Sequence, residues 1–155
     1  MLRALLGWLF PPAPTVEDSV FGRLRFQEMS DPATSYWEGT SVFAPTGAEV
    51  EVFVDAGAEG PGENQRELYR TIEARYAETR AALTPLLERA YRDWIEREPP
   101  ADVWAAFTLG SVSVRRVVRP GIEWELVYEC RDDEEHTFTA LMRDWQPDPE
   151  IRIDG

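Results

Sequence analysis

The sequence contains no lysine, a single cysteine and a single histidine, and these scarcities exclude several kinds of site. Cys130 alone cannot form a disulfide within the chain or a cysteine-rich zinc site. The lone His136 argues against a Ser-His-Asp triad and against a multi-histidine metal site. Residues 132–135 are all acidic, but they lack the alternating ligands and the glycine of a calcium loop. We therefore expect no catalytic residue, no metal and no cofactor.

Long hydrophobic runs are also scarce. The most apolar stretch, residues 1–10, carries one arginine and is followed by the proline-rich residues 11–14. As a helix it would span only about 15 Å, roughly half a hydrocarbon core, so we expect no transmembrane span. No clean cleavage site for a secretory signal follows it. We divide the chain into an apolar leader with its linker, residues 1–14, and a single domain, residues 15–155.

The role of the leader stays open among three readings. It could dock on the domain or on a second subunit, which would make the protein a homo-oligomer. It could instead be a frayed tail, or a segment that lies on a membrane surface and anchors the protein there.

Positive charge is in short supply. Asp and Glu number 29 against 16 arginines, which gives a net charge of −13. Such a chain is repelled by phosphate backbones and by anionic membranes, so we expect no nucleic-acid partner. A basic protein would be attracted to it. The hydrophobic fraction of 43% is that of a globular protein.

Many of the carboxylates alternate with apolar residues in strand-like segments. Residues 122–130 are the clearest case, and they predict a sheet with one apolar face and one acidic face. Three strands are expected before the helical region, at residues 21–26, 36–43 and 49–55. Three more are expected after it, at residues 107–118, 122–130 and 136–144, with a short edge strand open at 151–153.

A helical segment separates the two groups of strands. Asn64 and Glu67 resemble a capping box, and apolar residues then recur at three- and four-residue steps as far as Ile95. Pro85 falls inside this pattern, so we expect a kink or a new helix start there, with Thr84 as the cap. The predicted fold is α+β: an antiparallel sheet of about six strands, βββ-α-βββ, with the Pro-interrupted helical segment on one face.

A set of short motifs resembles a known family. The motifs are G-x-L at residues 22–24, W-E-G at 37–39, V-x-V-x-V-D at 50–55, and Gln65 followed by Tyr69. Together they resemble a family of uncharacterised bacterial domains. Such domains are encoded alone or near toxin–immunity loci, so the resemblance implies a stand-alone cytoplasmic protein and, as one version, an immunity-type binder. It implies no catalytic residue.

Large aromatic residues on strands are the best functional lead, because Trp, Tyr and Arg dominate binding hot spots. By parity Trp124 belongs to the core, whereas Tyr36 and Trp37 cannot both face the helix. An exposed ring flanked by carboxylates would suit a basic partner. The candidate partner-binding residues are Tyr36, Trp37, Glu38, Glu49, Glu51, Glu123, Glu125 and Trp145.

Three functions follow as hypotheses. The first is a non-catalytic interaction protein that binds a basic protein, with toxin neutralisation as a concrete version. The second is a small hydrolase that uses strand carboxylates or a metal, and the third is a self-associating structural domain. A catalytic pair of Cys130 and His136 is not expected, because the acidic residues 132–135 would raise the pKa of the thiol.

Overall fold

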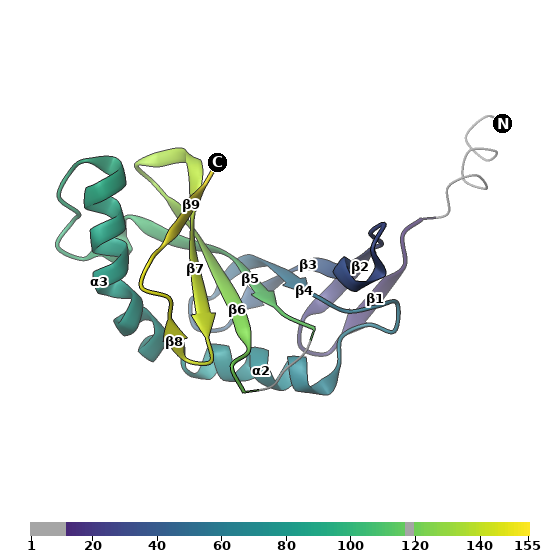
Figure 1. The fold of residues 1–155 in the computed structure, drawn as a ribbon. Coiled ribbons are helices and arrows are strands. Elements are labelled where there is room, and N and C mark those ends of the chain that lie inside the picture. The colour runs from purple at the N-terminus through teal and green to yellow at the C-terminus, as the bar shows by residue number, and fades with distance from the viewer. Residues whose placement is uncertain (1–11, 117–119) are drawn as a thin grey trace, which may run out of the picture.

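The computed structural model describes residues 12–116 and 120–155. Most of the expected leader (residues 1–11) and the last two residues of one expected strand (residues 117–118) lie outside the described part. Figure 1 shows the arrangement of the helices and strands. The strands are β1 (Thr15–Asp18), β2 (Gly22–Gln27), β3 (Tyr36–Phe43), β4 (Ala48–Val54), β5 (Phe107–Val114), β6 (Glu123–Cys130), β7 (Asp133–Arg143), β8 (Gln146–Pro147) and β9 (Arg152–Asp154). The helices are α2 (Glu63–Ala74) and α3 (Tyr76–Ile95), with single 3-10 turns at Pro32–Thr34 and Val103–Ala105.

The strands form one open sheet in the order β1-β2-β3-β4-β5-β6-β7-β8, with β9 also paired to β7. Every pairing is antiparallel except β4 with β5, which are parallel because both helices lie between them in the chain. The predicted class, α+β, is confirmed, and the predicted antiparallel sheet is observed except at this one parallel pair. The predicted number of strands is wrong, since the described residues contain nine rather than about six. The strands without a firm prediction, β1, β8 and β9, have two to four residues, too few for alternation to be recognised.

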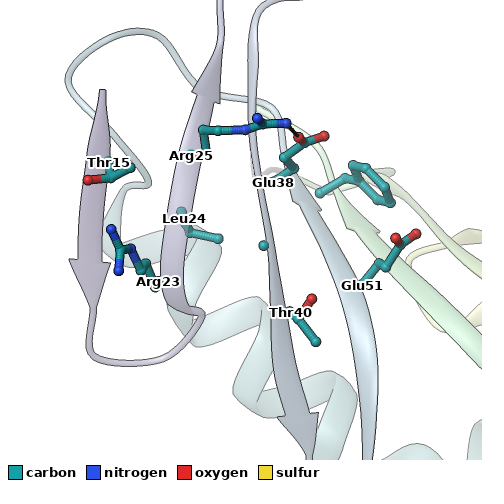
Figure 2. Close-up of a pocket in the computed structure, with 9 residues that line it drawn as sticks. Thr15, Arg23, Leu24, Arg25, Glu38, Thr40 and Glu51 are labelled. Atoms are coloured by element: carbon teal, nitrogen blue, oxygen red, sulfur yellow. Dashed lines mark hydrogen bonds and ion pairs between the residues drawn. The ribbon is translucent and has the colours of Figure 1, made fainter. Parts of the chain in front are cut away.

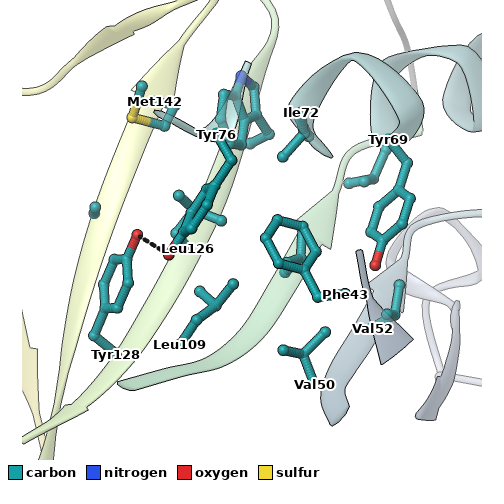
Figure 3. Packing of buried hydrophobic residues seen from close by; sticks show 14 of the residues in the cluster. Phe43, Val50, Val52, Tyr69, Ile72, Tyr76, Leu109, Leu126, Tyr128 and Met142 are labelled. Atoms are coloured by element: carbon teal, nitrogen blue, oxygen red, sulfur yellow. Dashed lines mark hydrogen bonds between the residues drawn. The ribbon is translucent and has the colours of Figure 1, made fainter. Parts of the chain in front are cut away.

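Both helices pack against one face of the sheet and enclose the core. Val52 of β4 and Leu126 of β6 are fully buried there. Figure 3 shows Tyr69 and Ile72 of α2 and Tyr76 of α3 directed at these strands. Neither helix of the described residues is long and apolar enough to cross a membrane. The core therefore lies between the sheet and a two-helix layer, as the apolar stripe predicts.

Gln65 fixes the helical layer to the parallel strand pair. Helix α2 begins at Glu63 and is preceded by Gly62. The Gly62 N–H donates to Gln65 Oε1 over 2.9 Å. The buried Gln65 amide donates in turn to the carbonyls of Asp55 and Arg115, at 3.0 and 2.8 Å. These carbonyls directly follow β4 and β5, so one side chain ties both strand ends to the first turn of α2.

The prediction that the helical segment is interrupted and restarts at Pro85 is wrong. Helix α3 runs from Tyr76 to Ile95 through Pro85, and the break lies instead at Arg75, whose φ and ψ of −104° and 11° separate the two helices. Thr84 is not a cap: its hydroxyl donates to the Arg80 carbonyl over 2.9 Å and accepts from the Trp104 indole at the same distance. A proline costs a helix one backbone donor, and here packing on the sheet keeps the helix continuous.

Candidate functional site

The face of the sheet turned away from α2 and α3, called the open face below, carries the side chains that alternate with the core. In β6, Trp124 and Leu126 are fully buried on the helix side. Glu123, Glu125 and Glu129 have the opposite parity and lie on the open face. The alternation expected for this strand is therefore observed. The open face of β3 and β4 carries Tyr36, Glu38, Thr40, Val42, Glu49, Glu51 and Phe53.

Arginines on neighbouring strands, or directly after one, neutralise part of this negative charge. Glu38 Oε1 lies 2.6 Å from the Arg25 guanidinium and accepts from Gln27 at the same distance. Glu125 lies 3.0 Å from Arg115, and Glu123 forms a further pair, 2.8 Å from the Arg143 guanidinium. Exposed pairs of this kind contribute only about 0–1 kcal/mol each to stability. Their main effect is to make the open face a surface of mixed charge rather than a purely acidic one.

Other carboxylates on the open face have no such counterpart. Glu49, Glu51 and Glu129 make no ion pair with any residue of the described part. Glutamates such as Glu67 and Glu78 also lie exposed on the outer surfaces of the helices. Negative charge alone therefore does not distinguish the open face from the rest of the molecule.

What distinguishes the open face is a hollow of about 420 Å³ over β1 to β4. Figure 2 shows its lining, with Arg23 and Arg25 on β2 and the carboxylates of Glu38 and Glu51 on the next two strands. Phe53, which also lines the hollow, is the register partner of Glu38 and follows Glu51 by two residues in β4, so its ring adds an apolar surface next to the two carboxylates. The hollow thus combines an aromatic ring, two acidic groups and a basic wall. Its remaining lining residues are Thr15, Leu24, Gly39 and Thr40.

Two local features shape the hollow. A Cβ on Gly39 would lie 2.3 Å from the Arg23 carbonyl oxygen, so only glycine lets β2 approach β3 this closely. This glycine belongs to the W-E-G motif and has a packing role. Next to the hollow, the rings of Tyr36 and Phe53 meet edge to face with centroids 6.1 Å apart. The pair fixes the position of Phe53 by contact across β3 and β4.

The structure separates the candidate residues into two groups. Tyr36, Glu38, Glu49, Glu51, Glu123 and Glu125 all lie on the open face. Trp37 is 3% exposed on the helix side, where its indole donates to the Gly57 carbonyl over 2.8 Å. Trp145 packs against Trp124, with the Arg75 guanidinium 4.3 Å from its ring centre. Because these two indoles are engaged in the core and its border, we leave Trp37 and Trp145 out of the candidate surface.

Cys130 and His136 line a second cavity, of about 490 Å³, beside the β6–β7 turn. His136 Nδ1 lies 2.9 Å from a carboxylate oxygen of Asp133, which also accepts from the exposed Trp94 indole over 2.7 Å. Burial, together with the charge of Asp132, raises the pKa of the Cys130 thiol. A thiol with a raised pKa is a poor nucleophile, as the acidic turn predicts. No three His, Cys, Asp or Glu side chains of residues 12–116 and 120–155 form a metal-binding group.

Sequence reasoning did not select Arg23, Arg25 or Phe53 as site residues. A signal for Phe53 was present, since it has the same parity as Glu49 and Glu51 in β4. The two arginines could be placed on one side of their strand, but the pairing of Arg25 with Glu38 requires the register of β2 against β3. No local pattern specifies that register.

Comparison with known proteins found no match for this chain among family models, curated proteins or solved structures. The resemblance to uncharacterised bacterial domains therefore stays an expectation from short motifs, two of which have structural roles here, at Gly39 and Gln65.

Proposed function

We propose that this chain is a non-catalytic interaction protein that binds a basic protein through the open face, with the hollow over β1 to β4 as the principal contact. The observation that carries the proposal is the composition of the hollow. Glu38 and Glu51 line the hollow next to Phe53, the register partner of Glu38, and Glu51 makes no ion pair within the described residues. An arginine or lysine of a partner would gain both a carboxylate and an aromatic surface there.

The overall charge supports a partner of this kind. A net charge of −13 attracts a basic protein from a distance, and such steering raises the association rate. The arginine wall of the hollow then restricts which basic surface fits, because an unmatched positive group near Arg23 or Arg25 is repelled. Neutralisation of a basic toxin in the cytoplasm is one concrete version of this function.

Replacing Glu51 by arginine tests the proposed contact. The wild-type chain would first be used to capture its partner from an extract of its source cells, and binding would then be measured by interferometry. We expect Glu51→Arg to weaken binding about tenfold or more, because the change removes an attraction and adds a repulsion at the contact centre. Binding of the wild-type chain should also weaken as salt rises.

The matched control is Glu67→Arg, which makes the same change in charge on the exposed surface of α2. It alters the net charge equally but lies on the far side of the molecule from the hollow, so we expect less than about a twofold loss. Equal losses for the two variants would show that only overall charge matters. Salt-independent binding would contradict the electrostatic part of the proposal.

One observation favours the alternative of a hydrolase. Glu38 and Glu51, two of the candidate carboxylates, line the same hollow together with the apolar Leu24 and Phe53. A catalytic acid is normally enclosed by apolar groups, whereas Glu38 is bonded to the Arg25 guanidinium and the Gln27 amide. The arrangement therefore suits recognition of a charged group better than proton transfer.

A further inference from the structure

A second groove lies at the opposite end of the molecule, between α3 and the C-terminal segment 149–153. Its volume is about 330 Å³. Leu86, Ala90 and Ile151 form its partly buried apolar floor, and Trp94, 46% exposed, stands at its side. The C-terminal segment is held in place by Arg89, which donates to the Pro149 carbonyl. The groove is therefore a formed, apolar surface in the described part of the chain.

The chemistry of the groove matches that of the leader. Asp93, Glu150 and Arg89 line the groove, and the two carboxylates outnumber the one guanidinium, so its border is negative overall. Residues 2–10 of this chain are apolar apart from one positive charge, at Arg3. A groove with an apolar floor and an acidic border fits a segment of this composition.

Geometry decides whether the leader comes from the same chain or from another. The leader precedes β1 in the chain. Strand β1 lies at one end of the strand order and β8 at the other, and α3 lies beside β8. Eight strands span about 34 Å, whereas eleven fully extended residues reach only about 37 Å. If the leader crossed its own sheet, residues 2–10 would be stretched across it, and none of them would be left to lie in the groove. A second copy has no such restriction.

We infer that residues 2–10 of one copy dock in the groove between α3 and segment 149–153 of a second copy, and that two copies exchange leaders about a two-fold axis. Each leader then covers the exposed Trp94 of the other copy. The exchange closes the assembly at two chains, because each copy offers one leader and one groove.

Sedimentation velocity over a concentration series tests the association. The full chain should sediment as a dimer, and deletion of residues 2–11 should give a monomer. Ala90→Arg, which fills the groove and repels Arg3, should raise the dissociation constant about tenfold or more. Ala82→Arg makes the same change on an exposed position of α3 outside the groove and should leave the dimer intact. Far-UV circular dichroism would verify that each variant is folded.

Disulfide trapping separates exchange between copies from other contacts. Leu6→Cys and Ala90→Cys are made in separate chains, mixed and mildly oxidised, and the native Cys130 does not interfere because it is buried. A disulfide-linked pair is expected from this mixture and not from Leu6→Cys mixed with Ala82→Cys. A monomeric full chain, a dimer unaffected by the deletion or by Ala90→Arg, or equal trapping at both positions would overturn the inference. Binding of a monomer to phosphatidylglycerol vesicles through the leader would overturn it as well.

Discussion

Replacing Trp124 by alanine is expected to lower the free energy of unfolding by about 4 kcal/mol, the largest loss we predict for a single substitution. Trp124 is fully buried, and its ring packs edge to face against Trp145 with centroids 5.5 Å apart. Its indole donates to the Asp144 carbonyl over 2.6 Å. Asp144 has a φ of 51°, an uncommon value outside glycine, and its carboxylate also accepts from the Gly121 N–H over 2.9 Å. The substitution thus creates a cavity and frees a strained turn.

Urea unfolding followed by circular dichroism would measure this loss. Trp124→Phe is the comparison: it keeps most of the buried ring but removes the donor to Asp144, so we expect a loss of about 1–2 kcal/mol. A loss below about 1 kcal/mol for the alanine variant would contradict the placement of Trp124 in the core.

Replacing Asp18 by asparagine is expected to cost about 2–3 kcal/mol at neutral pH. The Asp18 carboxylate is buried at the end of β1 and accepts from the backbone N–H groups of Val20 and Phe21, at 2.9 and 3.1 Å. Its second oxygen lies 2.9 Å from the Arg66 guanidinium of α2. One carboxylate therefore connects the first hairpin to the helical layer, and the neutral amide cannot pair with Arg66.

This cost should depend on pH. Burial raises the pKa of the Asp18 carboxyl, but the hydrogen bonds from Val20, Phe21 and Arg66 together outweigh it and hold the pKa below its usual value. A carboxyl with a depressed pKa stabilises the fold above its unfolded-state pKa, about 3.9, and this contribution is lost as pH falls through the folded pKa. The stability difference between wild type and Asp18→Asn should therefore be full at pH 7 and shrink below about pH 4.

Denaturant midpoints at a series of pH values would measure that dependence. The neighbouring Glu17→Gln removes an equal charge from a side chain that is 77% exposed and lies 3.7 Å from Arg23. We expect this control to change stability by less than about 0.5 kcal/mol at any pH. A pH-independent cost at Asp18 would show that its charge has no part in joining the hairpin to α2.

The alternation of apolar and polar residues along the strands predicted which face of the sheet most of the strand side chains occupy. Val52 and Trp124 lie inward, and Glu51 and Glu125 lie on the open face, because strand geometry alone fixes which side each residue occupies. Alternation also required that one of Tyr36 and Trp37 face away from the helices, but it could not choose between them. In the structure Trp37 faces inward, opposite Val54.

Long-range pairing accounts for what the sequence did not predict. The parallel pairing of β4 with β5 depends on how the helical layer returns the chain, and Gln65 contacts a carbonyl 50 residues away. The hollow requires the register that places Arg25 opposite Glu38. The continuous helix at Pro85 is a case in which tertiary packing outweighs local preference. Each of these features depends on segments far apart in the chain, which no short pattern encodes.

Carboxyl footprinting tests the central claim, that the open face is where this protein meets its partner. The chain would be labelled with a carbodiimide and an amine, once purified and once in an extract of its source cells, and the modified carboxylates would be read by mass spectrometry. Glu51 and Glu49 on the open face should be labelled in the purified chain and protected in the extract, while Glu67 and Glu78 on the helices stay equally reactive. Protection confined to the helices, with Glu51 unchanged, would contradict the account.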